Sequence, residues 1–149
     1  MSNLTLRPYT NADEDAAIEL WRRTWHAAYP QIDFGARVAW WRERWRSELV
    51  PQTRIMVAEM DGVLEGFVTV DPKTGYLDQI VVAPEFWGSN VAAMLLDASK
   101  RIAPAGIELL VNKDNGRAIA FYEKNGFVMA GDDVNPVSGR PVFRMRWRP

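Results

Sequence analysis

The sequence has no cysteine and only one histidine in 149 residues. Without cysteine there is no disulfide framework, no thiol nucleophile and no thiolate ligand for a metal. A single histidine is too few for a histidine-based zinc site, so we expect no metal centre. The chain also lacks a long apolar run, and its start, MSNLTLRPYT, lacks the apolar core of a signal peptide. These absences predict a cytoplasmic protein that does not enter a membrane.

An excess of charge of either sign is missing as well. The 18 basic and 19 acidic residues leave a net charge of −1. Broad binding of nucleic acid needs a basic face that displaces counterions, so this composition argues against that function. The length fits one domain, residues 1–149, which is long enough to bury about two thirds of the surface of its unfolded chain.

Tryptophan is abundant, with seven residues, and five of them fall between Trp21 and Trp45. This segment predicts two helices, because its apolar residues recur at helical spacing. The first helix is capped by Thr10 or Asn11 and stops before Pro30, and the second covers about residues 34–49. Before them, LTLRPYT alternates apolar and polar residues and is expected to form a strand.

The next segment predicts three antiparallel strands. RIMVAEM and VLEGFVTV are joined by Asp61-Gly62, a sequence that favours a tight hairpin turn, and YLDQIVV follows at residues 76–82. A helix from Val91, the apolar strand IELLVN, a helix capped by Asn115, and the strands FVMA and VFRMRW complete the chain. The order β-α-α-β-β-β-α-β-α-β-β indicates a mixed α/β domain, with an antiparallel meander that leads into a β-α-β crossover.

The stretch PEFWGSN, residues 84–90, connects the third meander strand to the next helix. Unpaired N–H groups and the helix dipole at such a connection suit an anion. The stretch has only one glycine and no basic residue, however. On these residues alone, an ordinary strand-to-helix connection is favoured over a phosphate site.

Two segments together carry a resemblance to a known family. VAPEFWGSNVAAMLL (82–96) and LLVNKDNGRAIAFYEKNGF (109–127) resemble the two conserved-pattern segments of the Gcn5-related N-acetyltransferase family, and the predicted element order is similar over nearly the whole chain. The family patterns are V-x-P-E-(Y/F)-R-G-x-G-x-G/A-x-x-L-L and L-x-V-x-x-x-N-x-x-A-x-x-F-Y-x-x-x-G-F. The resemblance implies the fold of this family and transfer of an acetyl group from acetyl-CoA to the primary amine of a small molecule.

The resemblance also implies positions for the cofactor. The pantetheine arm would run beside Val81 and Val82, where two neighbouring strands splay apart. The pyrophosphate would bind the main-chain amides of Trp87, Gly88, Ser89, Asn90, Val91 and Ala92. Trp87 replaces a family arginine or glutamine and Asn90 a glycine, so we expect weaker binding than an arginine-bearing loop would give. Asn115 would hydrogen-bond the pantetheine, and Tyr122 would reach the sulfur.

Tyr122 is the candidate catalytic acid. It lies seven residues after Asn115, hence nearly on the same helix face. A phenol stays protonated near neutral pH and can donate to a leaving thiolate. In the alternative interpretation, Tyr122 is a core aromatic residue and Asn115 only a helix cap.

Asp78 is the first candidate for the general base, because it shares a strand face with Tyr76, Ile80 and Val82. The alternative, which we favour, is a salt-bridged carboxylate. Glu59 and Glu65 are expected to be solvated hairpin residues.

The resemblance places the acceptor pocket at the two tryptophan-rich helices, with Trp25, His26, Tyr29 and Trp41 as candidate substrate-binding residues. Most aromatic residues here would be packing, and one or two would line the site. The arginines of the second helix are expected to form a solvated face paired with Glu43 and Glu48. Two other functions stay open, namely a related fold that binds acyl-CoA without catalysis and acetylation of a protein or peptide amine. A homodimer is possible through the C-terminal strand VFRMRW.

Overall fold

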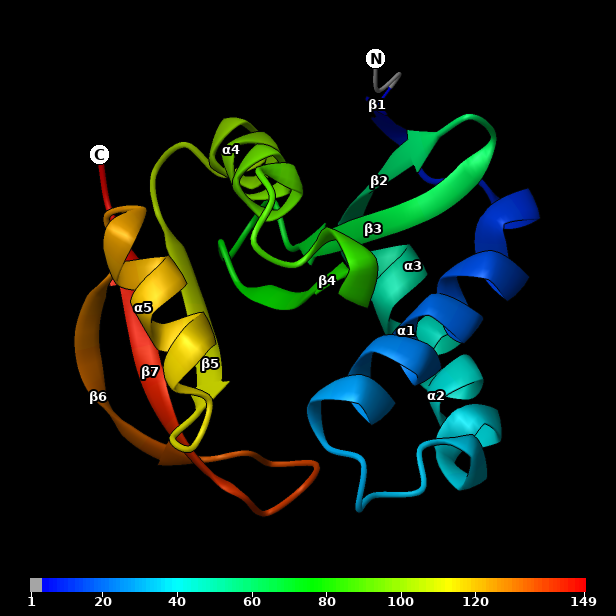
Figure 1. The fold of residues 1–149 in the computed structure, drawn as a ribbon. Helices are drawn as coiled ribbons and strands as arrows, with labels where there is room; N and C mark the ends of the chain where they lie inside the picture. The colour runs from blue at the N-terminus through cyan, green and yellow to red at the C-terminus, as the bar shows by residue number, and fades with distance from the viewer. Residues whose placement is uncertain (1–3) are drawn as a thin grey trace.

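The computed structural model describes residues 4–149, and its helices and strands follow the predicted order (Figure 1). No helix in this part of the chain is long and apolar enough to cross a membrane. The first half consists of β1 (Leu4–Pro8), α1 (Glu14–Ala28), α2 (Val38–Arg44), α3 (Val50–Gln52), β2 (Arg54–Met60), β3 (Val63–Val70) and β4 (Leu77–Val82). The second half consists of α4 (Val91–Ile102), β5 (Ile107–Asn112), α5 (Gly116–Lys124), β6 (Val128–Val134) and β7 (Pro141–Trp147).

The strands form two antiparallel sheets that meet at one point. The first sheet has the order β1-β2-β3-β4 and the second the order β5-β7-β6. The sheets are joined by a parallel bridge between Tyr76 and Glu108, where the Glu108 N–H donates to the carbonyl of Gly75 at 3.0 Å. Beyond this bridge β4 and β5 do not pair, which confirms the mixed α/β fold with a crossover between two strands that splay apart.

The first sheet is covered on both faces. Alternate residues of β3 point to opposite sides, so Val68 packs in a core with Leu95 of α4, while Phe67 packs in a second core with Trp21 and Trp45. The second core holds α1 and α2 against the sheet (Figure 1). The sequence therefore places Trp21, Trp25, Trp41 and Trp45 on one side of the sheet and the aliphatic helix α4 on the other, where Trp87 and Trp147 also pack.

The predicted second helix is broken into parts. After α2, residues Trp45–Leu49 adopt a π-helical turn that leads into α3. The expected solvated arginine face is correct only in part, because Arg37 and Arg46 are exposed but Arg42, Arg44 and Arg46 also pair with residues of other elements. Arg42 and Arg46 both contact Glu14 of α1, at 2.8 and 2.6 Å. Of the two predicted acidic partners, Glu48 does pair with Arg44, at 3.0 Å.

Two expectations about the hairpin and the last strand also need correction. Glu59 is not simply solvated, since Arg7 donates to it at 2.7 Å. Burial raises the pKa of Glu65, and one of its carboxylate oxygens is buried without a partner among the described residues. β7 lies between β5 and β6, so both of its edges are paired and VFRMRW is not free to pair across a dimer.

We predict that the glycine at position 75, where the two sheets meet, is needed for the stability of the fold. Its φ is +77°, and a Cβ there would lie 2.3 Å from the carbonyl oxygen of Gly106. We expect Gly75→Ala to lower the free energy of unfolding by about 3 kcal/mol, from left-handed strain and from overpacking against the main chain. The measurement is urea denaturation followed by circular dichroism. Gly139→Ala is the matched control, because Gly139 has a φ of +73° and open space around it. Equal losses in the two variants would contradict this role.

Candidate active site

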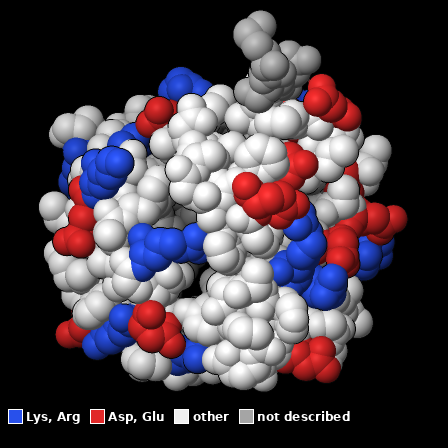
Figure 2. Space-filling view, viewed as in Figure 1, with Lys and Arg blue, Asp and Glu red and all other residues white. Residues whose placement is uncertain are grey.

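A cavity of about 1080 Å³ occupies the space where β4 and β5 separate. Residues of α1 and α2 line one side of it, and residues of β5, α5 and the β6–β7 loop line the other. The space-filling view shows a hollow near the centre of the molecule with a basic side chain at its rim (Figure 2). The cavity is large enough for a long, narrow ligand together with a second small molecule.

The loop before α4 presents free main-chain donors at this cavity. Gly88, whose φ is +83°, lines the cavity and has open space at its Cβ position. Within residues 4–149 the N–H groups of Gly88, Asn90 and Ala92 have no partner, as expected for the start of a helix. The N–H groups of Trp87 and Ser89 donate instead to carbonyls of the preceding turn. Only some of the predicted anion-binding amides are therefore available.

The replacement of glycine by asparagine at position 90 is harmless to the backbone. Asn90 has φ −88° and ψ 6°, outside the left-handed region that favours glycine. The one position of this loop with a positive φ is Gly88, where glycine is the favoured residue.

Trp87 does not point away from the protein but lies over the end of β4. Its indole N–H donates to the carbonyl of Val82 at 2.8 Å. Because Gln79 and Ala83 direct their N–H groups to β3, the intervening Ile80 and Val82 direct theirs to the cavity. The edge of β4 therefore offers N–H donors to a ligand, while Trp87 already occupies the Val82 carbonyl.

Asn115 is the N-cap of α5, as predicted. Its Oδ1 accepts from the N–H of Ala118 at 3.2 Å, which leaves its Nδ2 without a partner among the described residues. Gly126, with a φ of +93°, follows the end of this helix. Asn115 and Tyr122 both line the cavity, which their common helix face predicts.

Tyr122 is buried against Phe121 and Phe127, with ring centroids 5.4 and 5.6 Å away. Its hydroxyl makes no hydrogen bond within residues 4–149, and burial raises the pKa of the phenol well above its ordinary value. Tyr122 therefore packs in the core, as the structural interpretation expects, and also lines the cavity, as a catalytic role would require. A buried phenol with a raised pKa holds its proton and can donate it.

Asp78 lies in the cavity wall but is not a free base. Arg44 of α2 donates to its two carboxylate oxygens at 3.0 and 2.5 Å, and Gln79 donates at 3.1 Å. Both carboxylate oxygens of Asp78 are therefore engaged in hydrogen bonds within the described residues. The geometry favours the salt-bridged interpretation and makes Asp78 a residue that positions Arg44.

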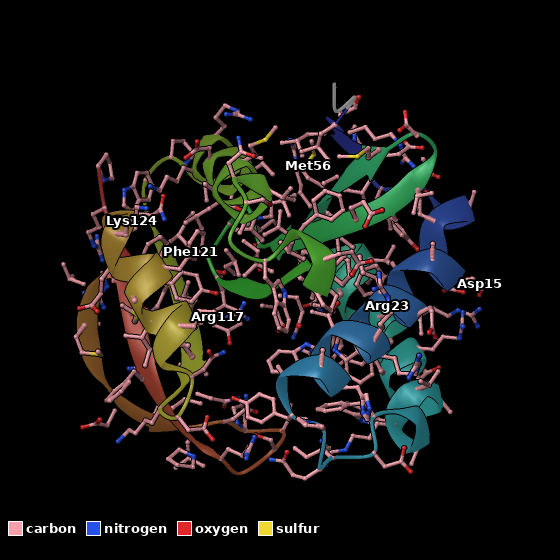
Figure 3. The ribbon with its side chains drawn as sticks, in the orientation of Figure 1. Asp15, Arg23, Met56, Arg117, Phe121 and Lys124 are labelled. Atoms are coloured by element: carbon pink, nitrogen blue, oxygen red, sulfur yellow. The ribbon has the colours of Figure 1, made fainter. Side chains whose placement is uncertain are left out.

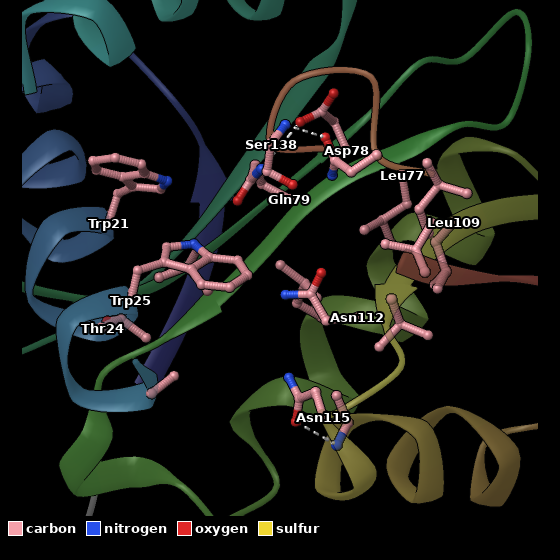
Figure 4. A pocket seen from close by; sticks show the side chains of 18 of the residues that line it. Trp21, Thr24, Trp25, Leu77, Asp78, Gln79, Leu109, Asn112, Asn115 and Ser138 are labelled. Atoms are coloured by element: carbon pink, nitrogen blue, oxygen red, sulfur yellow. Dashed lines mark hydrogen bonds between the residues drawn. The ribbon is translucent and has the colours of Figure 1, made fainter. Parts of the chain in front are cut away.

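The aromatic wall contains three of the four predicted acceptor residues. Trp25 stacks on Tyr29 with centroids 5.8 Å apart, and Trp41 stacks on Trp21 at 4.6 Å. Figure 4 shows Trp25 extending from α1 toward Asn112 and Asn115 on the opposite wall. His26 is exposed and does not line the cavity, since it follows Trp25 directly and points about 100° away around the helix.

Two buried polar atoms of this wall have no partner. They are the Thr24 hydroxyl and the Trp41 indole N–H, both in residues that line the cavity. A buried donor without a partner costs about 1–3 kcal/mol. Both atoms lie beneath the surface of the cavity, so this cost belongs to the packing of the wall among the described residues.

A cluster of side chains closes one end of the cavity, and we call it the latch: Tyr29, Asn112, Asp114 and Arg140. The Tyr29 hydroxyl donates to Asp114 at 2.9 Å and accepts from Asn112 at 3.0 Å. The guanidinium of Arg140, from the β6–β7 loop, lies 4.6 Å from the Tyr29 ring and 3.8 Å from Asp114. The latch connects the end of α1 to the far side of the cavity.

Residue patterns alone did not reveal Arg44, Thr24, the latch, or Arg117 of α5. Arg44 reaches Asp78 and Arg140 reaches Tyr29 across long stretches of chain, so no local spacing signals these contacts, whereas the pair of Arg44 with Glu48 does follow helical spacing. Arg117 carries its guanidinium 3.9 Å from the Trp87 ring centroid, across thirty residues of sequence. Its place within the quoted pattern LLVNKDNGRAIAFYEKNGF is a variable one and gives no signal.

Three comparisons with known proteins agree with this fold. Residues 14–127 match the family described as the acetyltransferase (GNAT) family. The chain is 25% identical over 139 residues to the peptidyl-lysine N-acetyltransferase YjaB of Salmonella typhimurium, covering 93% of this chain and 92% of the relative.

Among solved structures, it is similar to the PaiA N-acetyltransferase of Thermoplasma acidophilum in complex with coenzyme A. The TM-score is 0.78 at 21% identity, with 99% of each chain covered. A GCN5-related N-acetyltransferase from Rhodopseudomonas palustris gives a TM-score of 0.82 at 20% identity, covering 100% of this chain and 98% of the other. Because the family match covers more than half of the chain, this protein belongs to the GNAT family of acetyltransferases.

Proposed function

We propose that this enzyme transfers the acetyl group of acetyl-CoA to the primary amine of a small molecule. The observation that carries the proposal is the unpaired phenol of Tyr122 in the same cavity as the unpaired edge of β4. The residues present fit acetyl-CoA: free N–H groups before α4 suit its pyrophosphate, and the free Nδ2 of Asn115 suits an amide carbonyl of its pantetheine arm. When bound, acetyl-CoA supplies an activated thioester.

Tyr122 acts as the general acid. When the acceptor nitrogen bonds to the acetyl carbon and the carbon–sulfur bond breaks, the phenol of Tyr122 would give its proton to the departing sulfur and would then regain one from solvent water. Burial raises the pKa of Tyr122, so the protonated form persists to a higher pH than in a free tyrosine. The N–H of Val82, on the unpaired edge, donates to the acetyl oxygen as negative charge develops there.

The proton of the acceptor amine leaves through solvent water. Asp78 does not take it, because Arg44 holds both of its carboxylate oxygens. No other part of this mechanism needs a base within the cavity. The ion pair keeps α2 against β4 and so keeps the aromatic wall in place.

The position of the latch favours a small acceptor molecule over an extended peptide. An extended peptide needs an open groove, whereas Tyr29 and Arg140 meet at this end of the cavity. Trp25 provides an aromatic surface for an acceptor molecule. The second candidate acceptor is a protein lysine, because the Salmonella relative is named a peptidyl-lysine N-acetyltransferase.

Tyr122→Phe tests the catalytic acid. We expect kcat to fall by about 10²–10⁴-fold, because the proton donor is lost. The dissociation constant for acetyl-CoA should stay within about 2-fold, because the ring still packs. The assay is thiol release from acetyl-CoA with a panel of amines, with isothermal titration for binding.

The pH profile gives a second readout of the same variant. Because the pKa of Tyr122 is raised, wild-type kcat should not fall between pH 7 and 10 through loss of the phenol proton. A falling limb in this range that is absent from Tyr122→Phe would contradict the raised pKa, while it would still identify Tyr122 as the acid. Tight acetyl-CoA binding without turnover of any amine would instead favour a non-catalytic acyl-CoA-binding protein.

Two substitutions of Asn115 separate its cap from its role toward the cofactor. Asn115→Ala should lower the free energy of unfolding by about 1 kcal/mol, whereas Asn115→Ser keeps a capping oxygen and should cost less. Both variants lack the amide N–H, so both should weaken coenzyme A binding by roughly 2- to 10-fold. Wild-type affinity in Asn115→Ser would leave Asn115 as a helix cap alone.

An acceptor panel tests the substrate class. We expect kcat/KM for the best small amine to exceed that for lysine-containing peptides by at least about 10-fold, because the latch blocks an extended chain. Tyr29→Phe removes the hydroxyl that joins Asn112 and Asp114 and should narrow this ratio. Preference of the wild-type enzyme for peptides over every small amine would assign it to the lysine-acetylating class.

A further inference from the structure

Arg117 is the second residue of α5 and lies at the rim of the cavity. Figure 3 shows it on the side of α5 that faces α4 and the gap between the sheets. Its guanidinium carbon is 3.9 Å from the centroid of the Trp87 ring, the distance of a stacked contact. The N-cap at Asn115 fixes the start of this helix, and so it fixes where Arg117 emerges.

Trp87 is itself held in place, which makes it a firm platform. Its indole N–H donates to the Val82 carbonyl at 2.8 Å, and the ring packs against the core around α4. A guanidinium stacked by its flat face keeps its N–H groups at the edge, where they remain free to donate. The stacking therefore orients Arg117 without using its hydrogen bonds.

Arg117 is one of two cavity arginines that form no ion pair within the described residues; the other, Arg37, lies against Phe34 on the side of α1 and α2. Arg44 is paired with Asp78 and Glu48, and Arg144 with Glu108 and Asp133. Arg117 makes no ion pair or hydrogen bond within the described residues. It is therefore an available positive charge beside Gly88 and Ser89, which line the same cavity.

We propose that Arg117, oriented by Trp87, binds a phosphate group of coenzyme A and supplies the positive charge that the loop before α4 lacks. This inference rests on the proposed function, because it needs coenzyme A as the ligand. Planar N–H pairs match phosphate oxygens bidentately, which a free main-chain amide alone does not provide. Trp87 stands where the family pattern has a basic residue, and in this chain it positions Arg117 of α5 instead.

The experiment measures dissociation constants by isothermal titration for coenzyme A, 3′-dephospho-coenzyme A and pantetheine. Arg117→Met should weaken coenzyme A binding by about 10-fold or more, as for the loss of a hydrogen bond between charged groups. Pantetheine, which has no phosphate, should bind both proteins equally. Arg117→Lys should fall between wild type and Arg117→Met, because it keeps the charge and loses the planar pair of donors.

Arg101→Met is the matched control, since it removes the same charge from an exposed position of α4 that does not line the cavity. It should change the dissociation constant by less than about 2-fold, and the effect of Arg117→Met should shrink at high salt. A loss that persists with 3′-dephospho-coenzyme A assigns Arg117 to the pyrophosphate. A loss that disappears with this ligand assigns Arg117 to the 3′-phosphate.

Two results would overturn the inference while leaving the proposed function intact. One is an equal effect of Arg117→Met and Arg101→Met on coenzyme A binding. The other is an equal weakening of coenzyme A and pantetheine by Arg117→Met, which would indicate a purely structural role. If the wild-type protein binds no coenzyme A, the proposed function and this inference both fail.

Discussion

The bridge between Tyr76 and Glu108 is the constraint on which the site depends. Two parallel strands joined at one point and nowhere beyond it must diverge, and the divergence leaves unpaired main-chain groups along β4. In most proteins such groups would be expensive inside the molecule. Here they face a cavity that a ligand can fill. A ligand that hydrogen-bonds to these groups would offset the free-energy cost of leaving them unpaired.

The walls of the cavity are held by different physical means. On the side of α4 and α5, the helix starts and the cap at Asn115 set the positions of Gly88, Asn115 and Tyr122. On the side of α1 and α2, stacked aromatic rings fill the space and ion pairs hold α2 to its neighbours, with Arg44 reaching Asp78 of β4. Packing makes this second wall rigid, while the two arginine contacts to Glu14 fix how α1 and α2 lie relative to each other.

Local chemistry was predictable from the sequence, and side-chain partners across the fold were not. The Asp61-Gly62 turn has positive φ at both residues, at 52° and 82°, as a tight hairpin requires. Asn115 caps its helix because its side-chain oxygen reaches the free N–H of the residue three positions later. Such features depend on neighbours within four residues.

His26 and the arginines of α2 illustrate the limit. Their environments are set by how α1 and α2 rotate against the sheet, which a helical pattern rich in tryptophan on several faces does not determine. The stacking of Arg117 on Trp87 depends on the distance between two helices that follow different strands. The loop before α4 departs from the family pattern at Trp87 and Asn90. The cavity, however, is lined by residues of both α4 and α5, so the loop alone does not show which groups surround it.

The hydrogen bond from Trp87 to Val82 has a consequence for solubility and assembly. A strand with an unpaired edge is a template for another strand, and an open template invites aggregation or domain swapping. The indole occupies the last carbonyl of β4, so one acceptor of this edge is already satisfied within the chain. A foreign strand that paired with the whole edge would first have to break this hydrogen bond, which makes such pairing less favourable at the end of β4.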